Sequence, residues 1–105
     1  TMVGVTEAGA SAVTKTGVET RGNRQALGEQ EGAIAALVRV CATATTNGAM
    51  KAGARALWSI AHGNAGNKQA IGETEGAIAA LVRVCATATT EDAMEAGAGA
   101  LPILA

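Results

Sequence analysis

Few residues of this chain have side chains suited to chemistry: one histidine, His62, and two cysteines, Cys41 and Cys85. A catalytic histidine needs a carboxylate that orients it and a nucleophile or substrate site beside it. The residues around His62 in the sequence supply neither. The sequence therefore predicts a protein that is not an enzyme, in which His62 contacts a partner or has a structural role.

The two cysteines are also poor candidates for a metal or redox site. Cys41 and Cys85 with His62 do not make the four-ligand set that zinc requires. Two cysteines make no disulfide framework, which indicates a reduced cytoplasmic setting, with the nucleus as the alternative. If they lie on neighbouring helices about 8–10 Å apart, their Cα atoms are beyond the reach of a disulfide. We expect both to be buried small apolar residues, with no metal and no cofactor.

Two further segments have a simple structural interpretation. The glycine-rich segment 61–68 resembles a phosphate-binding loop only superficially, because it lacks the Gly-x-x-x-x-Gly-Lys-Ser/Thr spacing and follows a predicted helix. We expect it to end that helix. A group of glutamates recurs at the predicted turns, and we interpret them as solvated edge residues: Glu29, Glu31, Glu73 and Glu75.

Composition excludes several classes of partner. A length of 105 residues predicts one domain. The formal net charge is −1, from 8 basic and 9 acidic residues, so no general attraction to nucleic acid is expected. Trp58 is the one aromatic residue, whereas proteins that bind single strands stack bases on several rings. The chain has no continuous stretch of 18 apolar residues, so we predict no membrane span.

The chain is organised around a repeated block. The sixteen residues EGAIAALVRVCATATT occur at 31–46 and again, unchanged, at 75–90. Residues 23–29 match 67–73 at the same offset, and 7–13, 51–57 and 95–101 match one another. A period of this length is typical of stacked repeat proteins. We predict a single repeat domain over 1–105, with a partial repeat at 1–22, a full repeat at 23–66 and a nearly full repeat at 67–105.

Each full repeat divides into three predicted helices. The first is short, at 23–29 and 67–73, and begins at an asparagine that can cap it. Gly32 and Gly76 then allow a sharp turn. The second helix, at 33–44 and 77–88, carries a helical apolar stripe: Ile34, Leu37, Val38 and Cys41.

The third helix, at 47–62 and 91–105, is the most variable between repeats. Thr46 or Asn47, and Thr90 in the next copy, can cap it, and Met50, Ala54, Leu57 and Ala61 form its stripe. Glycines inside it either allow close approach of a neighbouring helix or reflect a bias toward small residues: Gly48, Gly53, Gly97 and Gly99, with Gly9 and Gly17. Pro102 predicts that the last helix ends near Ala100.

These repeats resemble the armadillo repeat. Residues 67–71 (NKQAI) followed by 75–82 (EGAIAALV) look like the first helix, the turn glycine and the start of the second helix in that family. Residues 56–61 (ALWSIA) look like its third helix, and Gly66-Asn67 falls where its Gly-Asn opens the next repeat. HEAT repeats are the alternative, but the short first helix and the glycine favour armadillo.

The resemblance implies an all-α fold, an α-solenoid of stacked armadillo-like three-helix repeats in a right-handed superhelix. It also implies a groove along the third helices that binds extended peptides through a recurring Trp and an Asn four residues later. Trp58 matches the Trp position and His62 falls at the Asn position, whereas Pro102 takes the Trp position in the last repeat. The implied partner is a protein or extended peptide bound by Trp58 and His62. Lys51 and Arg55 lie beside them in the predicted helix and complete the predicted site, and composition argues against nucleic acid and membrane as partners.

We therefore expect a non-catalytic protein-interaction scaffold. Lys51 and Arg55 make the predicted surface basic, while Glu95 makes its C-terminal side acidic, which favours a partner with acidic residues near an apolar anchor. The alternative is a self-assembling or engineered armadillo fragment whose ends stack or swap to form a homo-oligomer. Identical residues in consecutive repeats and apolar rather than polar residues at both ends favour that alternative.

Overall fold

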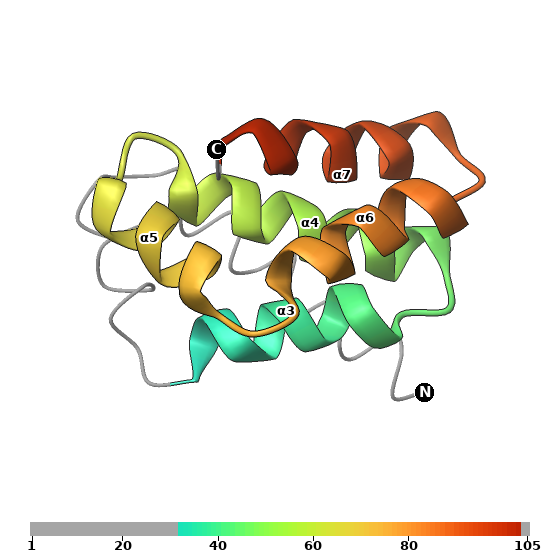
Figure 1. The fold of residues 1–105 in the computed structure, drawn as a ribbon. Coiled ribbons are helices and arrows are strands. Elements are labelled where there is room, and N and C mark those ends of the chain that lie inside the picture. The colour runs from blue at the N-terminus through green and yellow to red at the C-terminus, as the bar shows by residue number, and fades with distance from the viewer. Residues whose placement is uncertain (1–31, 104–105) are drawn as a thin grey trace.

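The computed structural model describes residues 32–103, and those residues form an all-α fold of five helices (Figure 1). The helices are α3 (Ala33–Thr43), α4 (Asn47–Ala61), α5 (Ala65–Glu73), α6 (Ala77–Thr87) and α7 (Glu91–Ile103). None of them is long and apolar enough to cross a bilayer. The predictions for the partial repeat at 1–22 and for the first short helix at 23–29 lie outside the described residues, as do Glu29 and Glu31.

The two identical segments both form the predicted second helix. α3 and α6 each begin after a glycine with positive φ, 79° at Gly32 and 80° at Gly76. A residue with a Cβ is strained at such an angle, so glycine determines where each helix can start. In α3, the predicted stripe of Ile34, Leu37, Val38 and Cys41 is buried as a whole.

The third helices begin as predicted. Oγ1 of Thr46 accepts a hydrogen bond from the N–H of Ala49 at 3.1 Å, and Oγ1 of Thr90 accepts one from the N–H of Ala93 at 3.3 Å. Each threonine satisfies a donor that the first helical turn leaves unpaired. The apolar stripe of α4 is fully buried: Met50, Ala54, Leu57 and Ala61.

The predicted end of the last helix near Ala100 is wrong. α7 continues through Pro102 to Ile103. Proline has a φ that suits a helix, but it removes the bond to the carbonyl four residues back and its ring crowds that carbonyl. Here that carbonyl belongs to Ala98, which is exposed and can bond to water. The lost bond is therefore tolerated in the last turn.

The short first helix of the second repeat also differs from the prediction. α5 begins at Ala65 instead of Asn67, because Asn64 is its cap and accepts from the N–H of Asn67 at 2.9 Å. Asn67 itself is buried, and its Nδ2 donates to the carbonyl oxygen of Ile60 at 2.8 Å. Asn67 therefore ties α5 to the end of α4.

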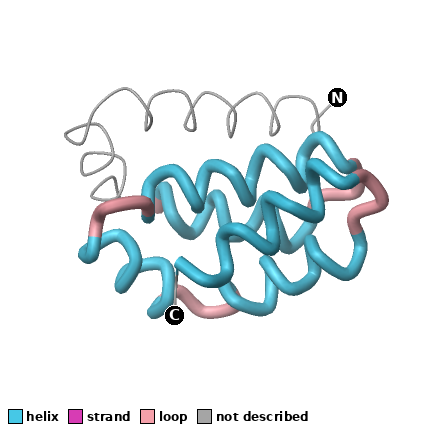
Figure 2. Tube along the Cα trace, turned by 90° about the horizontal axis from the view of Figure 1, so that it is seen from above, coloured by secondary structure: helices cyan, strands magenta, loops and turns pink. Residues whose placement is uncertain are grey.

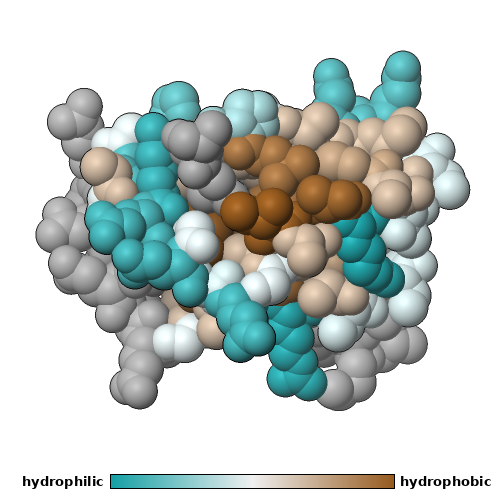
Figure 3. Space-filling model, in the orientation of Figure 1, coloured by the Kyte–Doolittle hydropathy of each residue, from teal (hydrophilic) through white to brown (hydrophobic). Residues whose placement is uncertain are grey.

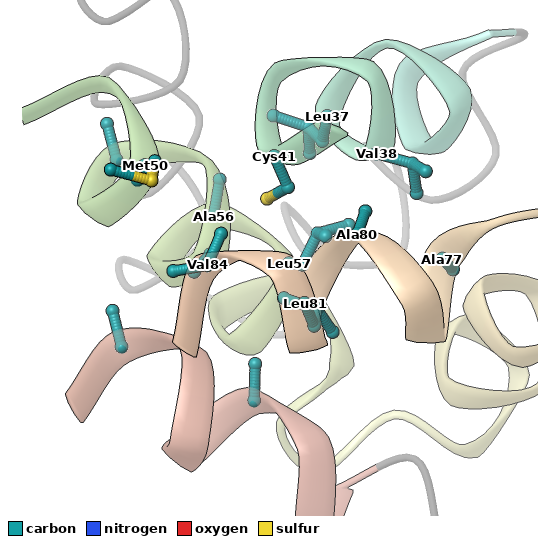
Figure 4. Close-up of a cluster of buried hydrophobic side chains, with 14 of the residues drawn as sticks. Leu37, Val38, Cys41, Met50, Ala56, Leu57, Ala77, Ala80, Leu81 and Val84 are labelled. Carbon is teal, nitrogen blue, oxygen red and sulfur yellow. The ribbon is translucent and has the colours of Figure 1, made fainter. Parts of the chain in front are cut away.

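The helices stack so that equivalent helices lie side by side. α3 packs against α6, and α4 packs against α7 (Figures 1 and 2). Their shared core is drawn in Figure 4, where Ala80 of α6 points toward Val38 and Cys41 of α3. The second and third helices of each repeat also approach closely, since a Cβ on Gly53 would lie 2.9 Å from Cγ1 of Val40. Close helix approach, one of the two interpretations of these glycines, is thus confirmed for Gly53.

Candidate partner-binding surface

The four residues predicted to bind a partner lie along one side of α4 and at its C-terminal end. Lys51, Arg55 and Trp58 follow one another at helical spacing along α4, and His62 is the residue that ends this helix. Arg55 and His62 are exposed, Trp58 is 37% exposed, and Lys51 is half-buried. Two cationic side chains, an indole and an imidazole therefore follow one another along one side of α4.

Trp58 is positioned by the neighbouring repeat. Its ring lies on Gly99 of α7 so closely that a Cβ at Gly99 would be 2.5 Å from Cζ3 of the indole. Arg55 is the residue of α4 that corresponds to Gly99, so the absence of a side chain is specific to the second repeat. The six-membered ring of the indole is thus held against α7, while the Trp58 side chain remains partly exposed to a partner.

The positive charge of this surface is less extensive than the sequence predicted, because Asp92 partly neutralises Lys51. Nζ of Lys51 lies 3.4 Å from Oδ2 of Asp92, at the start of α7, and the side chains are 34% and 70% exposed. Such an exposed ion pair contributes little to stability. It does place a negative charge beside Lys51, which leaves Arg55 as the stronger source of positive potential next to Trp58.

The acidic side predicted for the surface lies on α7. Glu95 and Pro102 are exposed there. An open hollow of about 330 Å³ is lined by Glu91, Met94, Glu95 and Ala98. The residues that line this hollow all belong to α7 and include none of the four predicted residues of α4, and the sequence did not predict it.

A second surface that the sequence missed is the outer side of the second repeat. Ile78 and Val82 of α6 are 54% and 50% exposed, and Met94 of α7 is 39% exposed. We call these residues, together with Cys85 and Ala98, the end face. The repeated sequence could have revealed this surface. The apolar stripe of the first repeat is buried against the second repeat, whereas none of the described helices covers the same stripe in the second repeat.

The junction between the two repeats is held by polar contacts as well as by the core. The guanidinium of Arg83, on α6, donates from Nη1 to the carbonyl oxygen of Cys41 at 2.9 Å and from Nη2 to that of Ala44 at 2.8 Å. Both acceptors lie at the C-terminal end of α3, where helical carbonyls lack partners. Cationic donors also suit the negative end of the helix dipole.

Asn47, the first residue of α4, makes a second polar contact across the junction. Its Oδ1 accepts from the N–H of Thr89 at 2.7 Å, and its Nδ2 donates to Oγ1 of Thr89 at 2.8 Å. The side chain thereby fixes the loop between α6 and α7. The alternative role considered for Asn47, as the cap of α4, belongs to Thr46 instead.

The two cysteines differ although their sequence neighbours are identical. Cys41 is fully buried, and burial raises the pKa of its thiol from 9.0 to about 12, against the opposing effect of the positive charge of Arg83. Cys85 is only half-buried, so the prediction that both are buried is wrong for Cys85. Both are free thiols. Within residues 32–103, no group of three metal-binding side chains is found.

The raised pKa of Cys41 predicts a loss of stability at alkaline pH. Below pH 9 the thiol is protonated in both states, whereas between pH 9 and pH 12 only the unfolded chain loses this proton. Stability therefore falls as pH rises, by about 1–2 kcal/mol between pH 8.5 and pH 10.5 for this one group. Urea denaturation at both pH values should show the fall in the native chain and in Cys85→Ala. A Cys41→Ala variant with an undiminished fall would contradict this assignment.

Comparison with known proteins gives no relative. No protein-family model matches the chain, and no curated protein and no solved structure is significantly similar to it. The assignment of a function therefore rests on the residues and surfaces described above.

Proposed function

We propose that the protein is a non-catalytic protein-interaction scaffold of armadillo type, an α-solenoid fragment with a right-handed superhelix. Its partner is an extended protein segment bound on the surface of Lys51, Arg55, Trp58 and His62. The observation that carries the proposal is the open indole of Trp58, held on Gly99 with the exposed Arg55 one turn before it. Side-by-side packing of equivalent helices supports the solenoid.

The chemistry of the surface selects the kind of segment. An indole that is fixed on one side offers apolar contact area at little cost in conformational entropy. A guanidinium beside it favours a carboxylate, with which it can form two parallel hydrogen bonds. We therefore propose a segment with an aspartate or glutamate close to an apolar anchor. The anchor would lie on the exposed part of Trp58, and the carboxylate would reach Arg55.

Two peptides of twelve residues test the proposal. Each has one leucine, which is flanked by aspartates in the first peptide and by lysines in the second. Because Trp58 is the one tryptophan, its fluorescence reports binding directly. The aspartate peptide should shift the emission to shorter wavelength, with an affinity that falls as salt rises. The lysine peptide should have no effect.

Two variants of equal charge separate a local from a general effect. Arg55→Glu should abolish the response to the aspartate peptide, whereas Arg39→Glu, an exposed site on α3, should retain it. Calorimetry with Trp58→Ala checks the indole without relying on its fluorescence. Equal affinity in Arg55→Glu and Arg39→Glu, or no binding by the native chain, would refute the proposed site.

A further inference from the structure

The end face differs from its counterpart in the first repeat in exposure alone. Its residues correspond one by one to residues of α3 and α4 that are all buried: Ile34, Val38, Cys41, Met50 and Ala54. Ile78 is 54% exposed against 7% for Ile34, and Val82 is 50% exposed against 6% for Val38. The same side chains thus form a protein interface in one place and an open apolar surface in the other.

The shape and position of this surface fit a docking site. Figure 3 shows a concentrated apolar patch on the side of the molecule that carries α6 and α7. The open hollow of about 330 Å³ on α7 is lined by Met94 and Ala98 of the end face and by the carboxylate residues Glu91 and Glu95. An apolar surface with a polar rim is typical of an interaction site.

The internal junction shows what covers such a surface. On the first repeat it is covered by α6 and α7, which present mainly small side chains that are at most 3% exposed: Ala77, Ala80, Val84, Ala93, Ala96 and Ala100. We propose that the end face binds a further helix pair of this same kind, with alanines at i and i+3 and a valine at i+7. The end face contains none of the four residues of the proposed peptide site on α4.

The partner should also carry a specific arginine. At the internal junction Arg83 donates to the carbonyl oxygens of Cys41 and Ala44. The corresponding acceptors on the end face are the carbonyl oxygens of Cys85 and Ala88, at the C-terminal end of α6. An arginine next to the valine of the partner helix would reach both. Asn47 accepts a hydrogen bond from the N–H of Thr89 at the internal junction, and Glu91 is the equivalent residue in the second repeat. Its carboxylate could accept the corresponding N–H from the loop of the partner.

A second copy of this chain is a poor candidate for the same place. Its own α6 and α7 already use their small side chains against α3 and α4. The equivalent alanines of its α4 are buried too: Ala49, Ala52 and Ala56. Within residues 32–103, the remaining copy of the pattern of small residues lies on α3, where Ala36 is exposed and Ala33 and Val40 are half-buried. The occupant is therefore a separate helix pair whose small-residue side is free.

Cys85 makes the proposal testable in the full chain. Residues 62–105 are appended once more after Ala105, which continues the repeat in register, and the cysteine of the added repeat is replaced by alanine. If the added helices dock, Cys85 should become as protected as Cys41, and its rate of reaction with a thiol reagent should fall by about tenfold or more. Unchanged reactivity of Cys85 in the extended chain would overturn the proposal, whether or not the added helices form.

Two matched variants and one concentration series complete the test. Val82→Glu in the extended chain should restore the reactivity of Cys85. Replacing the arginine of the added repeat that corresponds to Arg83 by alanine should restore it in part. The 105-residue chain that carries Val82→Glu provides the reference rate for this variant, because a carboxylate one turn from the thiol of Cys85 changes its reactivity by itself. If Cys85 of the native chain instead becomes protected as concentration rises, together with a doubled mass in light scattering, the end face pairs with a second copy and the proposal is wrong.

Discussion

Val38→Glu should destabilise the protein by about 3–5 kcal/mol, the cost of an uncompensated charge in the core. Val38 is 6% exposed and lies between α3 and α6. Because a small domain has a stability of about 5–15 kcal/mol, the variant should be largely unfolded at moderate temperature. Thermal denaturation followed by circular dichroism measures the change.

The control for this variant has identical sequence neighbours. Val82 occupies the same place in the second copy of the block, but it is 50% exposed. Val82→Glu should change the free energy of unfolding by no more than about 0.5 kcal/mol, as is usual for exposed sites. Two variants with equal stability would mean that the two copies of the block are equivalent in solution, contrary to the structure.

Arg83→Ala has the next largest expected effect. It removes two hydrogen bonds from a charged donor and leaves the carbonyl oxygens of Cys41 and Ala44 without this partner. Each such bond typically contributes about 1.5–3 kcal/mol, but Arg83 is half-buried and water can reach the site. We expect a loss of about 2 kcal/mol in urea denaturation.

Arg39 provides the matched comparison for Arg83. It is the same residue in the first copy of the block, it is exposed, and its guanidinium has no hydrogen bond to any residue in the range 32–103. Arg39→Ala should therefore leave stability nearly unchanged. A loss as large as that of Arg83→Ala would show that arginine at this position acts through the helix itself and not through the junction.

The helices were predictable because their signals are local. The stripe of Ile34, Leu37, Val38 and Cys41 specifies which side of α3 is buried, and Thr46 stands directly before the helix that it caps. The sequence analysis assigned the cap of the short helix to Asn67 instead of Asn64, because either residue type can cap a helix and Gly66 between them suggests a break. The choice is made by the buried bond of Asn67 to Ile60, a contact to another helix.

The surfaces were only partly predictable, because exposure depends on neighbours that lie far away in the sequence. Trp58 and Arg55 were identified from their types and spacing, but the closeness of Trp58 to Gly99 requires the packing of α4 on α7. The difference between Val38 and Val82 has no local signal at all, since the sixteen surrounding residues are the same. It follows only from the position of each repeat in the stack.

The ring of Trp58 lying on Gly99 has a consequence for folding accuracy. Helices from two identical sixteen-residue blocks can pair wrongly during folding or between molecules, because the sequence of one block cannot be distinguished from that of the other. If one α4 packed beside another α4, the indole would meet the side chain of Arg55 at the place where α7 has Gly99. The contact of Trp58 with Gly99 therefore favours α7 over a second copy of α4 as the neighbour of this helix.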